Sequence, residues 1–142
     1  MIDVSRGVPG LNGQEPRSYR EFWPYYLSQH LHPMTQRVHA AGTLTAFAVG
    51  ISSLLRGKWK LFAAAPLFAY VPAFASHFIW EKNRPVVLGG SFFWAARADI
   101  EMVTKVVTGR IADDADAVRG GLGMSPDETT LADHRRLQPA AA

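Results

Sequence analysis

The sequence predicts an all-α protein, a helical membrane bundle with a central antiparallel helical hairpin and flanking interfacial or amphipathic helices. Residues 38–55 and 61–80 contain no charged side chain when their histidines are neutral. About twenty such residues suffice to cross the hydrocarbon core of a bilayer. Only the short loop RGKWK separates the two stretches, so the two helices would run antiparallel. The alternative interpretation is a buried helix pair in a soluble bundle.

The first expected helix follows an irregular N-terminal segment over residues 1–17, which are rich in glycine and proline. Ser18 and Glu21 have the spacing of a capping box, which would start a helix that runs toward His32. Pro24 would kink this helix. Its aromatic stretch FWPYYLSQHL suits a membrane–water interface, although an aromatic core face explains the pattern equally well.

The hairpin itself would consist of two longer helices. Pro33 can open the first, over residues 34–55, because proline suits the first helical position, and Gly57 can cap its end. The second helix, over residues 60–81, contains two prolines that would kink it, which membrane helices tolerate better than soluble ones.

The fourth expected helix covers residues 91–107 and mixes apolar with charged residues, so it would lie along the interface or cover the bundle. Its charged residues are Arg97, Asp99, Glu101 and Lys105. Beyond it the sequence predicts an acidic linker, a capped turn at residues 125–128 and a polar tail in which His134 is solvated. The chain is therefore divided into an irregular N-terminal segment (1–17), a helical membrane-embedded catalytic domain (18–109) and a polar C-terminal tail (110–142).

The composition narrows the possible functions. The chain has no cysteine, which excludes disulfides, thiolate zinc sites and cysteine nucleophiles. Fifteen basic residues against twelve acidic ones give a small positive excess, and the basic residues are scattered along the chain. This pattern weakly favours contact with an anionic membrane surface and argues against nucleic acid as a partner.

Five ionisable residues are expected to gather at one end of the hairpin, because antiparallel helices bring their outer ends together. They are His30, His32, His39, His77 and Glu81. His77 and Glu81 are four residues apart and share a helical face. Imidazoles with a carboxylate are the ligands of many non-haem Fe(II) oxygenases, whereas the lack of sulfur weakens a structural zinc interpretation. A single histidine is more often a core or interface group, so the metal hypothesis depends on the whole set.

Two polar residues beyond Glu81 are candidates for contact with a substrate. Asn83 and Arg84 directly follow the motif, and a guanidinium can hold a carboxylate through two parallel hydrogen bonds. Lys82 and Arg84 are at least as well explained as interfacial anchors that extend toward lipid headgroups.

The segments YYLSQHLHPMTQRVHAAGT, SHFIWEKNRP and FFWAARADIEM together resemble the membrane 2-hydroxy fatty acid dioxygenases, whose founding yeast member acts in phytosphingosine breakdown. The similarity covers about residues 20–105. The family's usual Asn before Pro is His32 here, and histidine is the poorer helix N-cap. His32 would therefore replace the cap or add a residue to the site.

The resemblance implies an integral membrane enzyme that uses Fe(II) and O2 to shorten a long-chain 2-hydroxy fatty acid by one carbon, without 2-oxoglutarate. It implies iron ligands at His30, His39 and His77, with Glu81 as a fourth catalytic residue, either a ligand or a partner of one. The expected substrate contacts are Tyr26, His32, Asn83 and Arg84. The site would face the cytoplasm, and the acyl chain would lie among the apolar helices beside membrane lipid.

Two other functions are compatible with the residues. The first is a metal-dependent membrane hydrolase or lipid-modifying enzyme that uses the same ligands, with zinc for example. The second is a non-enzymatic membrane scaffold or lipid-binding protein, in which the histidines only support the fold.

Overall fold

The computed structural model describes residues 7–11, 14–89, 91–125 and 127–137, and this part of the chain is helical without a strand. The all-α prediction is therefore confirmed. The α-helices are α1 (Tyr19–Ser28), α2 (Pro33–Leu55), α3 (Trp59–Ala64), α4 (Leu67–Ser76), α5 (Phe92–Val107), α6 (Ile111–Leu122) and α7 (Leu131–Leu137). A π-helical turn, η1 (His77–Glu81), and a 3-10 turn, η2 (Val86–Gly89), lie between α4 and α5.

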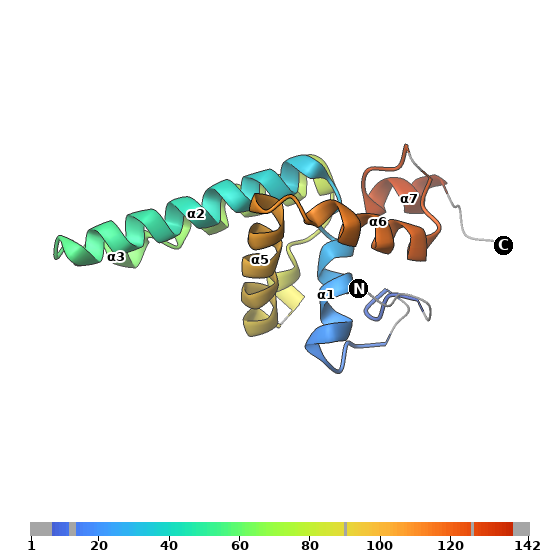
Figure 1. Cartoon of the computed structure of the whole chain (residues 1–142), viewed down its shortest axis with the longest axis horizontal. Coiled ribbons are helices and arrows are strands. Elements are labelled where there is room, and N and C mark those ends of the chain that lie inside the picture. The colour runs from blue at the N-terminus through green and yellow to red at the C-terminus, as the bar shows by residue number, and fades with distance from the viewer. Residues whose placement is uncertain (1–6, 12–13, 90, 126, 138–142) are drawn as a thin grey trace.

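The predicted hairpin is present: α2 runs out and α3 and α4 return alongside it, so that the pair projects from the rest of the molecule (Figure 1). Gly57 ends the outward helix with a positive φ of 65°, as expected for a glycine cap. The two helices approach closely at Gly42, where an added Cβ would lie 2.9 Å from the carbonyl oxygen of Phe68. Only glycine fits there without displacing the backbone of α4.

The returning segment was expected to be one kinked helix, but it is divided into α3, α4 and η1. Pro66 separates α3 from α4, whereas Pro72 lies inside α4. The helix then widens into η1 and ends at Lys82, whose φ of 53° is left-handed. His77 begins this π-helical turn and Glu81 ends it, so the motif singled out in the sequence coincides with an irregular turn.

The outer part of the hairpin, residues 44–72 and here named the arm, exposes apolar side chains. Both hairpin helices are long and apolar enough to cross a membrane. Only 33% and 17% of their most apolar windows are buried, whereas a core helix of a soluble protein is mostly buried. The large exposed residues include Leu44, Phe47, Ile51, Leu54, Leu55, Trp59, Leu61, Leu67, Phe68 and Val71.

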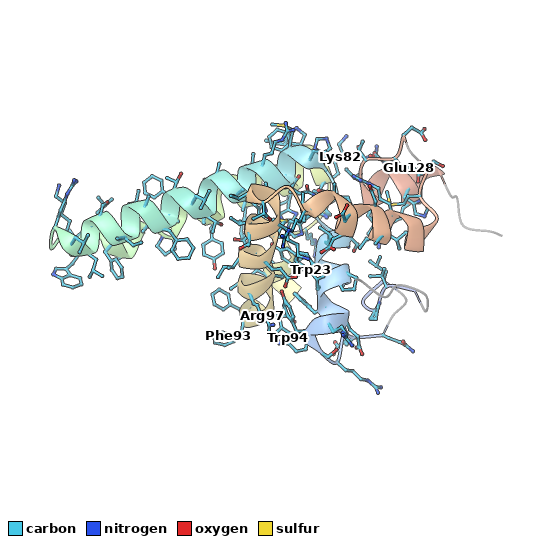
Figure 2. The ribbon with its side chains drawn as sticks, viewed as in Figure 1. Trp23, Lys82, Phe93, Trp94, Arg97 and Glu128 are labelled. Carbon is cyan, nitrogen blue, oxygen red and sulfur yellow. The ribbon has the colours of Figure 1, made fainter. Side chains whose placement is uncertain are left out.

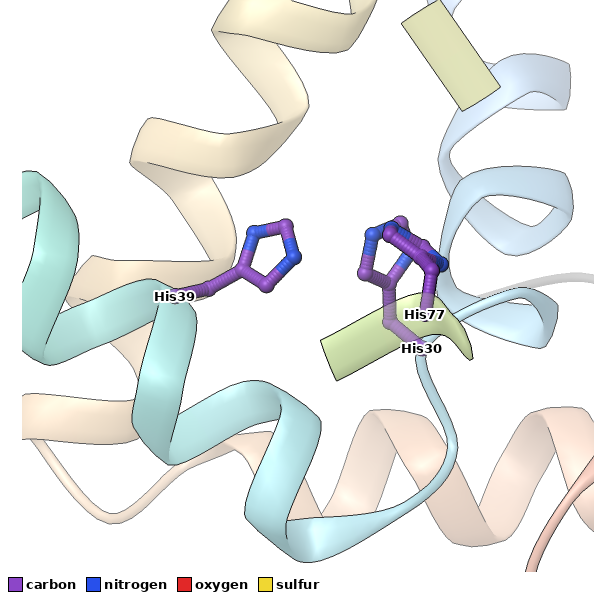
Figure 3. A group of neighbouring side chains, drawn as sticks. All are labelled: His30, His39 and His77. Carbon is purple, nitrogen blue, oxygen red and sulfur yellow. The ribbon is translucent and has the colours of Figure 1, made fainter. Parts of the chain in front are cut away.

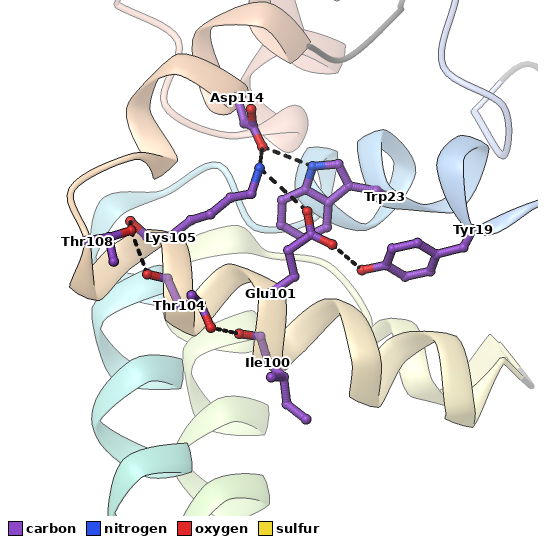
Figure 4. A network of polar contacts seen from close by, with 8 residues as sticks. All are labelled: Tyr19, Trp23, Ile100, Glu101, Thr104, Lys105, Thr108 and Asp114. Carbon is purple, nitrogen blue, oxygen red and sulfur yellow. Dashed lines mark hydrogen bonds and ion pairs between the residues drawn. The ribbon is translucent and has the colours of Figure 1, made fainter.

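The inner part of the molecule, here named the base, consists of α1, α5, α6 and α7 and contains the core. Its core cluster joins aromatic residues of α1 to small and aliphatic residues of α5 and α6. Polar contacts also connect these helices: the indole of Trp23 donates to Asp114, which pairs with Lys105, and the Tyr19 hydroxyl donates to Glu101 at 2.7 Å (Figure 4).

The prediction of a linker after residue 109 is wrong, because this segment forms α6. Ala115 and Val118 are buried in the core, and Ile111 and Leu122 pack against it. These four positions follow the i, i+4, i+7, i+11 spacing of one helical face. The acidic residues between them concealed this pattern, and they face outward or pair with neighbouring helices.

The prediction that His134 is solvated is also wrong. Its side chain is buried and its Nδ1 lies 2.8 Å from an oxygen of Glu128, which is buried as well. The expected turn at residues 125–128 is present, since the Ser125 amide donates to the Glu128 carboxylate. The turn is followed by α7, and Thr130, Leu131 and His134 are buried, so this segment packs against the molecule (Figure 2).

Candidate metal centre

Three histidines from three separate elements meet at the junction of the arm and the base (Figure 3). His30 follows α1, His39 lies in the second turn of α2, and His77 begins η1. All three are buried, with exposed fractions of 1%, 6% and 2%. One ligand atom of each ring lies within 4.8 Å of the others. The expected gathering of these three residues at the hairpin end is therefore observed.

Hydrogen bonds fix the orientation of the first two rings. His30 Nδ1 lies 2.6 Å from the carbonyl oxygen of Tyr26, and His39 Nδ1 lies 2.7 Å from Asp99 Oδ1. A carbonyl and a carboxylate can only accept, so each Nδ1 carries the proton and each Nε2 keeps a free lone pair. Asp99 is held in turn by the Thr43 hydroxyl, which donates to its second oxygen at 2.7 Å.

The third ring is oriented by an amide. His77 Nδ1 lies 2.7 Å from Asn83 Oδ1, while Asn83 Nδ2 donates to the backbone and side-chain oxygens of Gln29 at 3.0 and 3.1 Å. Since Gln29 offers two acceptors to the amide nitrogen, the amide oxygen must face His77. This ring therefore also donates through Nδ1 and leaves Nε2 free.

In their neutral forms, the three rings thus donate through Nδ1 and leave Nε2 available to a ligand. Burial lowers the pKa of His30 well below its usual value, and the neighbouring His39 and His77 lower it further. The Nε2 of His39 is buried without a hydrogen-bond partner in the described structure. An unsatisfied buried polar atom destabilises the fold, and a metal ion would satisfy it.

The residues present therefore match a metal site in chemistry, and nearly in spacing. Metal-bound histidines usually donate their other ring nitrogen to a carboxylate, carbonyl or similar acceptor, and all three rings do so here. Nitrogens that bind one tetrahedral ion at about 2.1 Å lie about 3.4 Å apart, so metal binding would require the most distant pair to approach by up to about 1.4 Å.

Glu81 lies outside this group of three. It is buried, and its Oε1 accepts a hydrogen bond from the backbone amide of His32 at 2.7 Å, while Oε2 has no partner in the described structure. Glu81 therefore holds the turn that leads from His30 into α2. His32 caps that helix, because its Nδ1 accepts from the Met34 amide at 3.1 Å. The expectation that His32 serves as the cap is confirmed.

An elongated apolar cavity of about 520 Å³ begins at the three histidines and continues between the hairpin helices. From His39 to Leu54 it follows fifteen residues of α2, which is roughly 22 Å at the helical rise. This length exceeds the thickness of one leaflet of a hydrocarbon core, which is about 15 Å. The cavity is therefore long enough for a long acyl chain. Its apolar lining includes Ala46, Phe47, Gly50, Ile51, Leu54 and Phe62.

Of the four residues expected to contact the substrate, only some lie at the cavity. Tyr26 lines the cavity and its ring stacks on His30 at 4.0 Å between centroids. Asn83 contacts His77 instead of the cavity. Among the described residues that line the cavity, neither His32 nor Arg84 is found, and Arg84 lines a separate pocket. A substrate contact by these two residues stays a prediction.

Sequence reasoning missed Asp99 and Gln29. Asp99 counted as one of several charges on an amphipathic helix, yet it lies near the buried positions Ala95, Ala98 and Met102 of α5. A carboxylate beside a buried helical face was the available signal. Gln29 gave no signal, since its contact with Asn83 joins distant segments of the chain.

Comparison with known proteins gives one match. No curated protein and no solved structure matches the chain significantly. A family model described as 2-hydroxy-palmitic acid dioxygenase Mpo1-like matches residues 16–111. The matched region contains the three histidines with their partners Tyr26, Asp99 and Asn83, and it ends where α6 begins. The chain therefore belongs to the family of 2-hydroxy-palmitic acid dioxygenase Mpo1-like proteins.

Proposed function

We propose that this protein is an Fe(II)-dependent membrane dioxygenase that shortens long-chain 2-hydroxy fatty acids by one carbon. The observation that carries the proposal is the group of three buried histidines, each with one ring nitrogen within 4.8 Å of the others, at the polar end of an apolar cavity. The family description independently names a 2-hydroxy fatty acid as substrate and a dioxygenase as activity.

His30, His39 and His77 would hold the ion, each as a neutral donor fixed by its Nδ1 hydrogen bond. Bound Fe(II) supplies redox chemistry toward O2 and open positions for the substrate hydroxyl and carboxylate. The protein's own part is positioning: Asp99, Asn83 and the Tyr26 carbonyl set the rings, and the cavity walls exclude water.

The reaction balances without a further reductant. A 2-hydroxy acid and one O2 give the acid one carbon shorter, CO2 and water. The bond between the carboxyl carbon and the hydroxyl-bearing carbon breaks, and O2 takes up the electrons. A co-substrate such as 2-oxoglutarate is therefore not required.

Two features of the structure support a position in the membrane. The tip of the hairpin carries Arg56, Lys58 and, at the start of α3, Lys60, and α5 exposes Phe93, Ile100 and Val107 along one face. About twenty helical residues span the hydrocarbon core, and counting back from Arg56 this reaches the first turn of α2.

His39 then lies just inside the interface opposite the loop. The α5 helix contacts α2 at this level, since Asp99 bonds both His39 and Thr43. Interfacial helices bury their apolar face about 5–10 Å into the boundary, which agrees with the exposed stripe on α5. The three histidines would therefore meet the head of a fatty acid while its chain enters the cavity. Whether this side faces the cytoplasm stays a prediction.

A second candidate function is metal-dependent hydrolysis. Three histidines with an open position also form the donor set of catalytic zinc sites, so the ligands alone do not choose the metal. The two functions differ in their need for O2. A lipid-binding scaffold would need neither metal nor O2.

The test is oxygen uptake by the detergent-purified protein after anaerobic loading with Fe(II) and addition of 2-hydroxypalmitic acid. We expect uptake together with an acid one carbon shorter, and neither in His77→Ala. The matched control is His32→Asn, which changes a histidine that lies outside the group of three and can still cap α2. Bound iron without uptake would contradict the dioxygenase, and hydrolysis supported by zinc would favour the alternative.

A further inference from the structure

A second pocket lies beyond the contact between His77 and Asn83, where α1, the segment after η1 and α7 meet. Its volume is about 520 Å³, within the range of small-molecule sites. Gln29 and Asn83 contribute to its wall. Its charged lining consists of Lys82, Arg84, Arg135 and Arg136, with no carboxylate among the described lining residues.

Within the described part of the chain these four cations form no salt bridge, although Arg136 attracts the carboxylate of Asp133. All four side chains are exposed, and the ion pairs present there involve other residues. They come from two segments that the fold brings together, residues 82–84 and α7. Like charges around one hollow repel each other and focus a positive potential in it, so the arrangement favours an anion.

The acidic residues in and next to α7 form their hydrogen bonds within this segment, and the Thr130 hydroxyl and Arg136 both help to lower the pKa of Asp133. Glu128 accepts hydrogen bonds from the Ser125 amide and from His134. Asp133 accepts from the amide and hydroxyl of Thr130 and thereby caps α7. These carboxylates stabilise the turn that presents the two arginines, and neither lines the pocket.

Lys82 reaches the pocket from an unusual backbone position. Among the described non-glycine residues it alone has a positive φ, 53°, where glycine is the usual helix-ending residue. Figure 2 shows Lys82 at the base end of the hairpin. This conformation ends η1 and turns the chain toward Arg84, so that both cations line the same pocket.

We propose that this pocket binds a small multivalent anion of the phosphate type, held by Lys82, Arg84, Arg135 and Arg136. Guanidinium groups pair with phosphate oxygens through two parallel hydrogen bonds, and two adjacent arginines suit a group with several such oxygens. The anion comes either from a soluble phosphate compound or from a phospholipid headgroup, since both present the same oxygens. The proposal is independent of the reaction at the histidines.

The test measures binding of inorganic pyrophosphate to the detergent-purified protein by equilibrium dialysis. A double variant, Arg135→Gln with Arg136→Gln, should weaken binding at least about tenfold, because two charge-assisted contacts are lost. The control is Arg20→Gln with Arg110→Gln, which removes the same charge from two exposed arginines outside the pocket. Lys82→Gln with Arg84→Gln tests the opposite wall should the α7 variant fail to fold.

A second arm measures binding to lipid nanodiscs with and without anionic phospholipid. Pyrophosphate binding that depends on the pocket supports a soluble ligand. Binding that depends on the pocket only in anionic nanodiscs supports a headgroup. Equal weakening in pocket and control variants would show unspecific charge attraction and overturn the site, as would absence of binding in both arms.

Discussion

The arm and the base of this molecule use the same helical structure for opposite purposes. In the arm, apolar side chains point outward and the side-chain hydrogen bonds described there, such as those of Thr45 and Ser52, stay within one helix. In the base, side chains of α1, α5 and α6 connect different helices through Trp23, Asp114 and Glu101. The histidines lie where these regions meet, so an apolar cavity ends at a rigid polar wall.

The strongest way to test this division is to remove a ligand at the junction. His39→Ala should abolish metal binding, because the remaining two imidazoles lack the third donor. His32→Ala should keep the metal and lose only the helix cap, about 1 kcal/mol of stability. The metal content of each variant is measured after dialysis. An equal loss of metal in the two variants would contradict the assignment of ligands.

The next test separates two carboxylates of α5. Asp99→Ala should weaken metal affinity roughly 10–100-fold, because His39 loses the acceptor that orients it. Glu101→Ala removes a carboxylate that bonds Tyr19 in the base, so metal affinity should stay unchanged. Competition with a chromogenic chelator provides the comparison. If both variants bind metal like the original protein, Asp99 does not position the site.

A third test changes the arm alone. Gly50 lines the cavity, and its Cβ position lies 3.6 Å from the Cβ of Ala65. Gly50→Leu should fill the cavity and shift activity toward shorter 2-hydroxy acids by roughly tenfold or more, with metal content unchanged. Ala48→Leu, at an exposed position outside the cavity, is the matched control. An unchanged chain-length profile in Gly50→Leu would place the acyl chain elsewhere.

The junction should also respond to pH. Burial lowers the pKa of His30, so the unfolded chain binds the proton more strongly than the folded one. Stability should therefore fall as the pH drops below about 6.5, by up to roughly 1.4 kcal/mol per pH unit for this group. Thermal unfolding of chelator-treated protein between pH 7 and 5.5 measures the slope. His30→Asn should reduce it, and an identical slope would exclude His30 as a cause.

The smallest expected effect concerns α6, which lies beyond the matched family region. Arg119 Nη2 donates to the carbonyl oxygen of Leu31 at 2.8 Å and holds the segment after His30. Arg119→Ala should lower the unfolding free energy by about 1 kcal/mol. Asp116→Ala removes only the exposed ion-pair partner of Arg119 and should change little. Urea titration of both variants decides whether α6 supports this segment.

The sequence predicted what depends on helix length and connectivity. A hairpin with a short loop returns the chain to its starting side, so His30, His39 and His77 were expected together and are found together. The sequence could not predict which face of α5 meets them, because this depends on packing across the base. Asp99 was therefore missed. The turn at residues 125–128 was expected, but no sequence pattern indicated that Glu128 would contact His134, so the burial of His134 was missed.

The convergence of the histidines also has a meaning for the chain as a polymer. An ion shared by these residues would close one short loop, between His30 and His39, and one long loop, between His39 and His77. Cross-links stabilise a fold by restricting the unfolded ensemble, and the restriction grows slowly with loop length. The ion would thus hold the end of α1 and both helices of the hairpin together at one point, and its release would let them separate independently.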